Sequence, residues 1–362
     1  MTKTSAQMPA DDTPRRRVTQ ADVARIAGVS QAMVSLVLNG SSSVRVTPET
    51  RQRVQDALKS TGYTVDIMGR RLRGGSNKII GVFTYESVFP SGVADFYRPF
   101  LLGIEEGAEA LGFDLLLFTS PGRREGRRRV YDKGANRLGI ADGCILLGRH
   151  TDRQELARLV AERFPFVFIG RRESPTGPVS YVGADYVSST HEIYDWMWGL
   201  GHRRIGLLGV DEEYEPTVDR RLGYVAAARR RRRVPIVLVE DDPAVALRHV
   251  KEHRLTALLV ESTAMAEAVR CLAEADGLNV PADLSIAVLG DSDPTQAAVR
   301  HDAAGGDTDW SMFRIPRREM GLRAVAMLVD LLAGREPEGG RHVLLPCELA
   351  TGSTVSPPPT AR

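Results

Sequence analysis

The sequence is poor in cysteine, in aromatic residues and in long apolar runs. It has three cysteines in 362 residues, and aromatic residues make up 6% of the chain. No stretch approaches the roughly 18 consecutive apolar residues of a membrane span, and the polar N-terminus lacks the apolar core of a secretion signal. These absences exclude a disulfide-rich secreted scaffold and a membrane protein, and they predict a cytoplasmic location.

Residues that carry metal or catalytic chemistry are also scattered. Cys144, Cys271 and Cys347 lie far apart, each in an apolar run, which is typical of reduced core cysteines rather than of a zinc site. The seven histidines form no H-E-x-x-H pattern, and no phosphate-binding G-x-x-x-x-G-K run occurs. We therefore expect no metal, no cofactor and no enzymatic activity.

Charge is distributed unevenly along the chain. Residues 1–78 contain 13 basic and 6 acidic residues, whereas the remainder contains 35 basic and 40 acidic ones. A small basic front joined to a mildly acidic body is typical of a protein whose front meets a polyanion such as nucleic acid.

The front of the chain has the cap and stop residues of three short helices. Thr19 and Asp22 form a capping-box pattern, and Gly28 ends the first helix in a tight turn. Ser30 then caps a second helix that stops at Asn39-Gly40, and a third runs from Thr47 to Gly62. Two helices joined by a turn with glycine form a helix-turn-helix, whose second helix can enter the DNA major groove.

The first turn of that second helix would face the base edges. Gln31 can donate to and accept from a base, whereas Ala32 and Met33 offer only apolar contacts. Thr19, Ser35 and Asn39 would donate to phosphate oxygens. The residues expected at this interface are Thr19, Ser30, Gln31, Ala32, Met33, Ser35 and Asn39. The spacing alone also fits a small helical bundle that binds protein.

After a glycine-rich joint at Gly74-Gly75, short apolar runs alternate with amphipathic stretches. The runs cover residues 79–83, 113–118, 144–147, 166–169, 205–208, 236–239, 257–260 and 286–289. Such runs are typical of parallel strands that are buried on both faces and linked by helices. Eight of them exceed one doubly wound sheet, so we predict two α/β lobes with a cleft at the carboxyl ends of their strands.

These patterns divide the chain into five segments. We expect a disordered leader at residues 1–14, a helix-turn-helix headpiece at 15–62 and a short helical segment with a linker at 63–77. A two-lobed core follows at 78–355, and a disordered tail at 356–362.

At the residue level the headpiece resembles that of the lac repressor (LacI/GalR) family of bacterial transcription regulators. The match runs through Val18-Thr19, Asp22-Val23-Ala24, Ala27-Gly28-Val29-Ser30, Val34-Ser35, Leu38-Asn39-Gly40, Val46, Thr50-Arg51, Val54 and Gly62-Tyr63. It continues more loosely through the segments 201–205, 220–224, 277–281 and 320–325. The resemblance implies a homodimer that binds a pseudo-palindromic DNA operator. It also implies that residues 63–77 form a hinge helix and linker, and that residues 78–355 form an effector-binding and dimerisation core like the periplasmic sugar-binding proteins.

The resemblance also assigns roles in the hinge. Leu72 matches a leucine that the family pushes into the minor groove, and Arg70 would meet phosphates beside it. Leu72 could instead be a linker residue packed on its own domain. Leu36, Met33, Val65 and Gly69 depart from common family residues, and Gly69 should weaken the free hinge helix by about 1 kcal/mol.

In the core, Arg220 matches the family's effector-binding arginine, with an ion pair inside its own helix as the alternative. Phe96 and Tyr97 are placed to stack on a ligand ring, and Asp293 lies in a loop that usually holds ligand-binding acids. Ser292 and Ser262 stand where relatives carry a sugar-binding acid and an asparagine, which weakens a sugar assignment.

The resulting hypothesis is a transcriptional regulator, most simply a repressor, controlled by a small molecule such as a sugar. A sugar-binding or sugar-modifying protein with a helical appendage would instead show no steep salt dependence of DNA binding. An activator or an effector-independent DNA-organising protein remains open, because the sign of regulation depends on where the operator lies.

Overall fold

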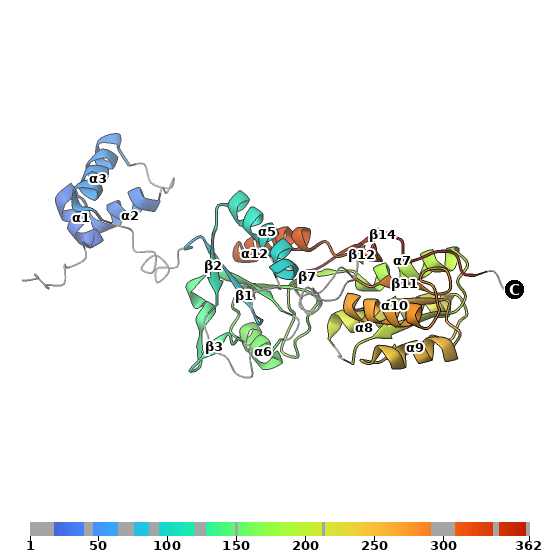
Figure 1. The fold of residues 1–362 in the computed structure, drawn as a ribbon. Helices are drawn as coiled ribbons and strands as arrows, with labels where there is room; N and C mark the ends of the chain where they lie inside the picture. Colours follow the sequence, from blue (N-terminus) through green and yellow to red (C-terminus); the bar gives the residue numbers. More distant parts are fainter. Residues whose placement is uncertain are drawn as a thin grey trace, which may run out of the picture. The chain divides into compact units, whose positions relative to one another are not determined.

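The computed structural model describes residues 18–39, 46–63, 76–86, 94–119, 128–148, 151–211, 214–290, 308–335 and 340–359. The chain divides into two compact units (Figure 1): residues 1–77, which contain the headpiece, and residues 78–362, which contain the core. The expected leader at residues 1–14 and most of the expected hinge, including Arg70 and Leu72, lie outside the described residues.

The headpiece contains three helices around a small apolar centre. They are α1 (Gln20–Ala27), α2 (Gln31–Asn39) and α3 (Pro48–Thr61). The Thr19 side chain and Asp22 form the expected capping box at the start of α1, and Thr47 caps α3. The helices bury Val23, Ala24, Ala27, Val34, Val54 and Ala57.

One half of the core, lobe 1, contains a six-stranded parallel sheet in the order β13-β7-β6-β5-β1-β2. Its strands are β1 (Ile79–Thr84), β2 (Asp114–Phe118), β5 (Gly143–Leu147), β6 (Phe166–Ile169), β7 (Tyr181–Ala184) and β13 (His342–Leu345). Its helices are α5 (Ala94–Leu111), α6 (Arg153–Ala161) and α12 (Arg317–Leu332), and a small hairpin of β3 (Tyr131–Asp132) and β4 (Ala135–Asn136) precedes the short helix η1 (Arg137–Ile140).

Lobe 2 is a second six-stranded sheet, in the order β14-β12-β11-β10-β8-β9. Its strands are β8 (Ile205–Gly209), β9 (Val237–Val239), β10 (Ala257–Val260), β11 (Ser285–Val288), β12 (Ser311–Arg314) and β14 (Glu348–Ala350), of which only β14 runs antiparallel to its neighbour. Its helices are α7 (Tyr186–Gly199), α8 (Glu215–Arg230), α9 (Pro243–Glu252) and α10 (Thr263–Ala275).

Each buried strand sends alternate side chains into different apolar clusters. On β1, Val82 packs in one cluster with residues of α5 and α12, whereas Phe83 packs in another with residues of α6. On β10, Leu259 packs in the same cluster as Val82, whereas Leu258 packs in a third cluster. Because both faces of each sheet are covered, these strands are continuous apolar runs. This confirms the expected fold class of two α/β lobes.

The chain passes between the lobes three times. It leaves lobe 1 after β7, returns from β12 to α12, and leaves again between β13 and β14. Lobe 1 therefore takes α12 and β13 from the end of the chain, more than 130 residues after β7.

Helices α5 and α12 approach each other closely through glycine. A Cβ atom added to Gly103 would lie 1.9 Å from the carbonyl oxygen of Arg318, and one added to Gly321 would lie 2.4 Å from that of Phe100. The two backbones can therefore touch only because neither position carries a side chain.

Two expectations are corrected. Cys271 is exposed on α10, whereas Cys144 and Cys347 are buried as predicted. The tail is not unstructured where it is described: the carbonyl oxygen of Ser356 accepts from the Ser285 hydroxyl at 3.1 Å and lies 2.9 Å from His202 Nε2. The Ser285 hydroxyl and the His202 ring both lie in lobe 2, so the tail is bonded to that lobe. The proline-rich sequence of the tail does not indicate these contacts.

No single described helix is long and apolar enough to span a membrane, although the bent pair of α1 and α2 meets that length and composition test.

Candidate DNA-binding surface and effector pocket

Helices α1 and α2 form a helix-turn-helix. Their axes bend by 103° across the turn, within the range of about 90–120° for this motif. Gly28 has a φ of 62°, in the left-handed region that favours glycine. The backbone N–H of Val29 then donates to the carbonyl oxygen of Ala24 at 3.0 Å and closes the turn.

The first turn of α2 presents two exposed side chains from a fixed helix. Ser30 begins this turn, and its hydroxyl accepts from the N–H of Met33 at 3.2 Å. Val34 is fully buried in the headpiece centre, which fixes the rotation of the helix. Gln31 and Ala32 are therefore exposed, and Met33 is half-buried beside them. This turn can meet the edges of base pairs in a major groove.

The core holds a cavity of about 110 Å³ where the lobes meet. It lies beyond the carboxyl ends of β8, β10, β11 and β12, the position where ligands bind in open α/β sheets. Its lining is Phe96, Tyr186, Val210, Tyr214, Pro216, Arg220, Glu261, Ser262, Thr263, Leu289, Gly290, Ile315 and Arg317. Aromatic rings, charged groups and hydroxyls in one cavity fit a small polar ligand with an apolar face.

Arg220 is the central cation of this cavity. Its guanidinium stacks on the Tyr186 ring, 4.4 Å from the ring centroid, and its Nη1 lies 3.5 Å from Glu261 Oε2. Both charged side chains are more than 90% buried. Arg220 Nε has no hydrogen-bond partner in the described structure, so a ligand acceptor could satisfy it.

Glu261 is a buried acid that follows β10. Its Oε2 accepts from the Thr217 hydroxyl at 2.9 Å, whereas its buried Oε1 has no partner in the described structure. Burial raises the pKa of the Glu261 carboxyl above its usual value, although the Arg220 guanidinium opposes this shift. The pair places a hydrogen-bond acceptor and a donor side by side in the cavity.

Comparison with known proteins decides the family. Residues 19–66 match "Bacterial regulatory proteins, lacI family", and residues 194–355 match "Periplasmic binding protein-like domain". An HTH-type transcriptional regulator from the aml 5' region of Streptomyces limosus is 30% identical over 92% of this chain and 94% of its own length. The chain belongs to the lacI family. It is therefore a DNA-binding transcriptional regulator.

Other relatives of this lacI-family chain cover nearly its whole length. The HTH-type transcriptional regulator CelR of Thermobifida fusca is 29% identical over 91% of this chain and 96% of its own. The repressor CytR of Escherichia coli K12 is 27% identical over 94% and 97%. Among solved structures, a CelR–cellobiose complex matches with a TM-score of 0.59 at 25% identity, covering 93% of this chain and all of that one. A lac repressor dimer on operator DNA shares the fold, with a TM-score of 0.66 at 23% identity, covering 94% of this chain and all of that one.

The structure groups most of the expected DNA-binding residues of this lacI-family headpiece on α1 and α2. The Thr19 hydroxyl is engaged with Asp22, to which it donates at 2.7 Å, and Ser35 is half-buried. Asn39 ends α2, and its side chain lies outside the described residues. Their roles in DNA binding stay predictions.

The expected effector residues separate into three groups. Phe96 and Arg220 both line the cavity. Tyr97 does not line it: its ring is 7% exposed, and its hydroxyl donates to Glu86 Oε2 at 2.8 Å. Asp293 lies outside the described residues. The alternative reading of Arg220 is wrong, because its ion-pair partner Glu261 lies on a different element from α8.

Sequence reasoning missed Glu261, Arg317, Tyr186 and Tyr214. Glu261 directly follows the apolar run 257–260, and a charged residue at the end of a buried parallel strand was the available signal. Arg317 follows β12, whose Ser-Met-Phe-Arg sequence is not a continuous apolar run. Its guanidinium stacks on the Phe96 ring, 4.7 Å from the centroid.

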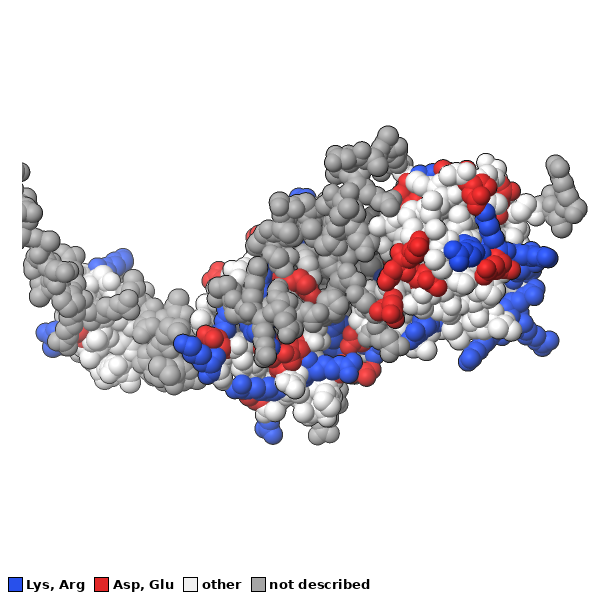
Figure 2. Space-filling view, turned by 60° about the horizontal axis from the view of Figure 1, so that its bottom comes forward, with Lys and Arg blue, Asp and Glu red and all other residues white. Residues whose placement is uncertain are grey.

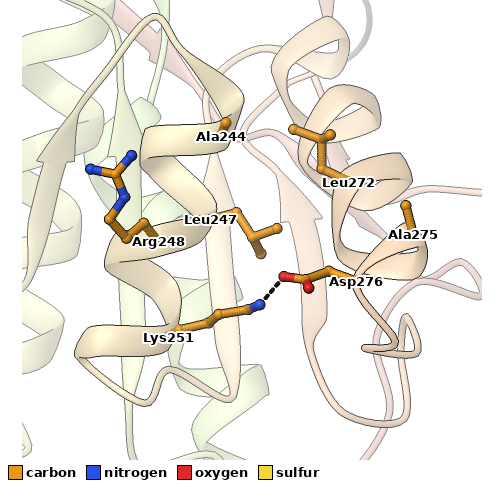
Figure 3. Close-up of a pocket in the computed structure, with 7 residues that line it drawn as sticks. All are labelled: Ala244, Leu247, Arg248, Lys251, Leu272, Ala275 and Asp276. Carbon is orange, nitrogen blue, oxygen red and sulfur yellow. Dashed lines mark hydrogen bonds and ion pairs between the residues drawn. The ribbon is translucent and has the colours of Figure 1, made fainter.

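A larger hollow of about 430 Å³ lies between α9 and α10, away from the cavity. Figure 3 shows Leu247 and Leu272 facing each other across it, with an ion pair between Lys251 and Asp276 at one end. It is a groove between two surface helices and lacks the convergent polar groups of the inter-lobe cavity. We therefore place the effector site between the lobes.

Figure 2 shows Lys and Arg side chains gathered at the right-hand end of the core, in the region of lobe 2. Arg229 and Arg230 lie in the last turn of α8, as expected for cations that complement a helix dipole.

Among the described residues, no group of three His, Cys, Asp or Glu side chains is placed to hold a metal ion.

Proposed function

We propose that this chain is a sequence-specific repressor whose affinity for a pseudo-palindromic operator is set by a small molecule bound between the lobes. The observation that carries the proposal is the exposed first turn of α2, held by Val34 and capped by Ser30. The protein works in the cytoplasm, where its DNA lies, and it needs no catalysis or cofactor for this role.

The DNA contacts come from one headpiece of each subunit in a homodimer. Thr19, Ser30, Ser35 and Asn39 hold phosphates, while Gln31, Ala32 and Met33 read bases. The hinge residues Arg70 and Leu72 enter the minor groove, as the family resemblance implies. The lac repressor dimer bound to its operator supports this arrangement.

The effector is a sugar or a related polar metabolite. A CelR–cellobiose complex supports this class, because CelR is a full-length relative. Arg220 pairs with adjacent hydroxyls or a carboxylate, and Phe96 covers an apolar ring face. Asp293 is a further ligand contact, as the family resemblance implies.

Selection of bound sequences from random duplexes tests this function. The wild-type protein should enrich an inverted repeat, and sugars that lower or raise its affinity should then be found by screening. Gln31→Ala should relax the preference at one base pair per half-site, by about 1–3 kcal/mol. Gln52→Ala is the matched control, because Gln52 is exposed on α3 and bonds only within that helix, to Asp56.

The proposal fails if the wild-type protein prefers no inverted repeat over scrambled competitor, with or without added sugars. An unchanged preference in Gln31→Ala would reject the assignment of α2 as the reading helix.

A further inference from the structure

Two pairs of charged side chains join the lobes beside the effector cavity. Arg171 and Arg172 follow β6 in lobe 1, whereas Glu215 and Asp219 lie in the first half of α8 in lobe 2. Arg171 Nε and Nη2 donate to Asp219 Oδ2 and Oδ1 at 3.0 and 2.9 Å. Arg172 Nη1 lies 3.1 Å from Glu215 Oε2. The cavity residue Arg220 is the next residue after Asp219.

Both arginines are anchored on lobe 1. Gly170 has a φ of 109°, which permits the turn after β6. Arg172 Nη2 donates to the carbonyl oxygen of Gly148 at 2.6 Å, and its guanidinium lies 4.5 Å from the Phe168 ring centroid. Arg171 Nη1 contacts Glu173 at 2.6 Å. If the lobes separated, these contacts would persist, whereas those with α8 would break.

These inter-lobe pairs are more buried than ordinary surface ion pairs. The side chains of Arg172 and Asp219 are 3% and 10% exposed, so water and salt screen their charges weakly. Arg171 and Asp219 also have two parallel hydrogen bonds, the geometry in which a guanidinium binds a carboxylate best.

The cavity behind these pairs is small. Its volume of about 110 Å³ is below the roughly 300 Å³ of most ligand sites. Separation of the lobes would enlarge this cavity, and the inter-lobe pairs oppose that separation.

We propose that Arg171 and Arg172 are positioning residues that hold the two lobes together beside the effector cavity. This inference rests on the proposed function, since operator affinity is the readout of lobe closure. In an equilibrium between open and closed lobes, a variant that opens the lobes and a cross-link that locks them shut cannot change operator affinity in the same direction.

The experiment compares open and locked forms of the full-length protein without effector. Asp219→Asn and Arg171→Gln each remove one partner of the Arg171–Asp219 pair. Glu173→Gln is the control, because it removes an Arg171 contact within lobe 1. The locked form carries Arg171→Cys and Asp219→Cys joined by a short bis-maleimide, with the exposed Cys271 changed to Ser. Small-angle X-ray scattering measures opening, and titration with the selected operator measures affinity.

Asp219→Asn and Arg171→Gln should increase the radius of gyration and shift operator affinity by about fivefold or more. The locked form should keep the wild-type radius and either match the wild-type affinity or move it the opposite way. Reversing the pair, with Arg171→Asp and Asp219→Arg together, should restore the wild-type values.

The inference is overturned if Asp219→Asn and Arg171→Gln behave like Glu173→Gln, or if the locked form shifts affinity in the same direction as they do. If wild-type protein binds no selected duplex, the proposed function fails instead, and the scattering data alone still decide whether these pairs hold the lobes together.

Discussion

Single residues in this protein show where sequence patterns stop being informative. Motif matching placed Arg220 in the effector site because its R-x-x-G-Tyr segment is distinctive. It could not place Glu261, whose partner lies 41 residues away on another element. A buried acid next to a buried arginine is a property of the fold, since only strand order brings α8 beside the end of β10.

Removing one partner of the Arg220–Glu261 pair should destabilise the protein more than removing both. Arg220→Met should lower the free energy of unfolding by about 3 kcal/mol, because it leaves the Glu261 carboxylate buried without its cation. The double variant with Glu261→Leu should lose less than Arg220→Met alone, since both charges are then removed. Urea unfolding of the three proteins measures these differences. Equal losses in the single and double variants would contradict the coupling.

His202 should make stability depend on pH. Burial lowers the pKa of this imidazole, although the Ser356 carbonyl opposes the shift, so the folded protein keeps the ring neutral. The unfolded chain binds a proton below about pH 6.5. The stabilisation is therefore complete above that pH and is lost as the pH falls toward the folded pKa.

Urea unfolding at pH 7.5 and 5.5 checks this expectation. His202→Gln should show a smaller decrease in unfolding free energy between the two pH values than the wild-type protein. An identical decrease in both proteins would show that other groups account for it.

At the scale of helices and strands, the apolar runs predicted eight of the twelve strands in the two lobe sheets. All eight runs form strands, and most of these strands are buried on both faces, where apolar side chains are needed at successive positions. The runs did not indicate β7, β12, β13 or β14. In β13, the burial alternates between exposed and half-buried, and β7 contains Gly183. The polar or glycine residues of these four strands shorten their apolar runs.

The contact between α5 and α12 should be the least tolerant helix pair to added volume. Gly103→Ala should lower the free energy of unfolding by about 3 kcal/mol, because the new methyl group overlaps the Arg318 carbonyl. Gly199→Ala is the control: Gly199 ends α7, and no atom lies within 4 Å of its added Cβ. That variant should be unchanged or slightly more stable, since alanine favours a helix over glycine. Thermal unfolding distinguishes the two.

At the scale of the whole molecule, charge separates the headpiece from the core. Residues 1–78 carry an excess of basic residues, and the remainder an excess of acidic ones. Operator affinity should therefore fall steeply with salt, by about 10³-fold or more between 50 and 200 mM if six or more phosphates are neutralised. Fluorescence anisotropy at several salt concentrations measures the slope. A flat response would favour a ligand-binding protein whose helices do not touch DNA.

The threefold passage of the chain between the lobes has a consequence for synthesis on the ribosome. Residues 23–57 form the apolar centre of the headpiece. Lobe 1 cannot be completed until α12 and β13, which end at residue 345, have been synthesised. A nascent polypeptide thus completes its DNA-reading part early and its sensing part almost last. Truncated products that keep the first and lack the second would be able to occupy operator half-sites without responding to any metabolite.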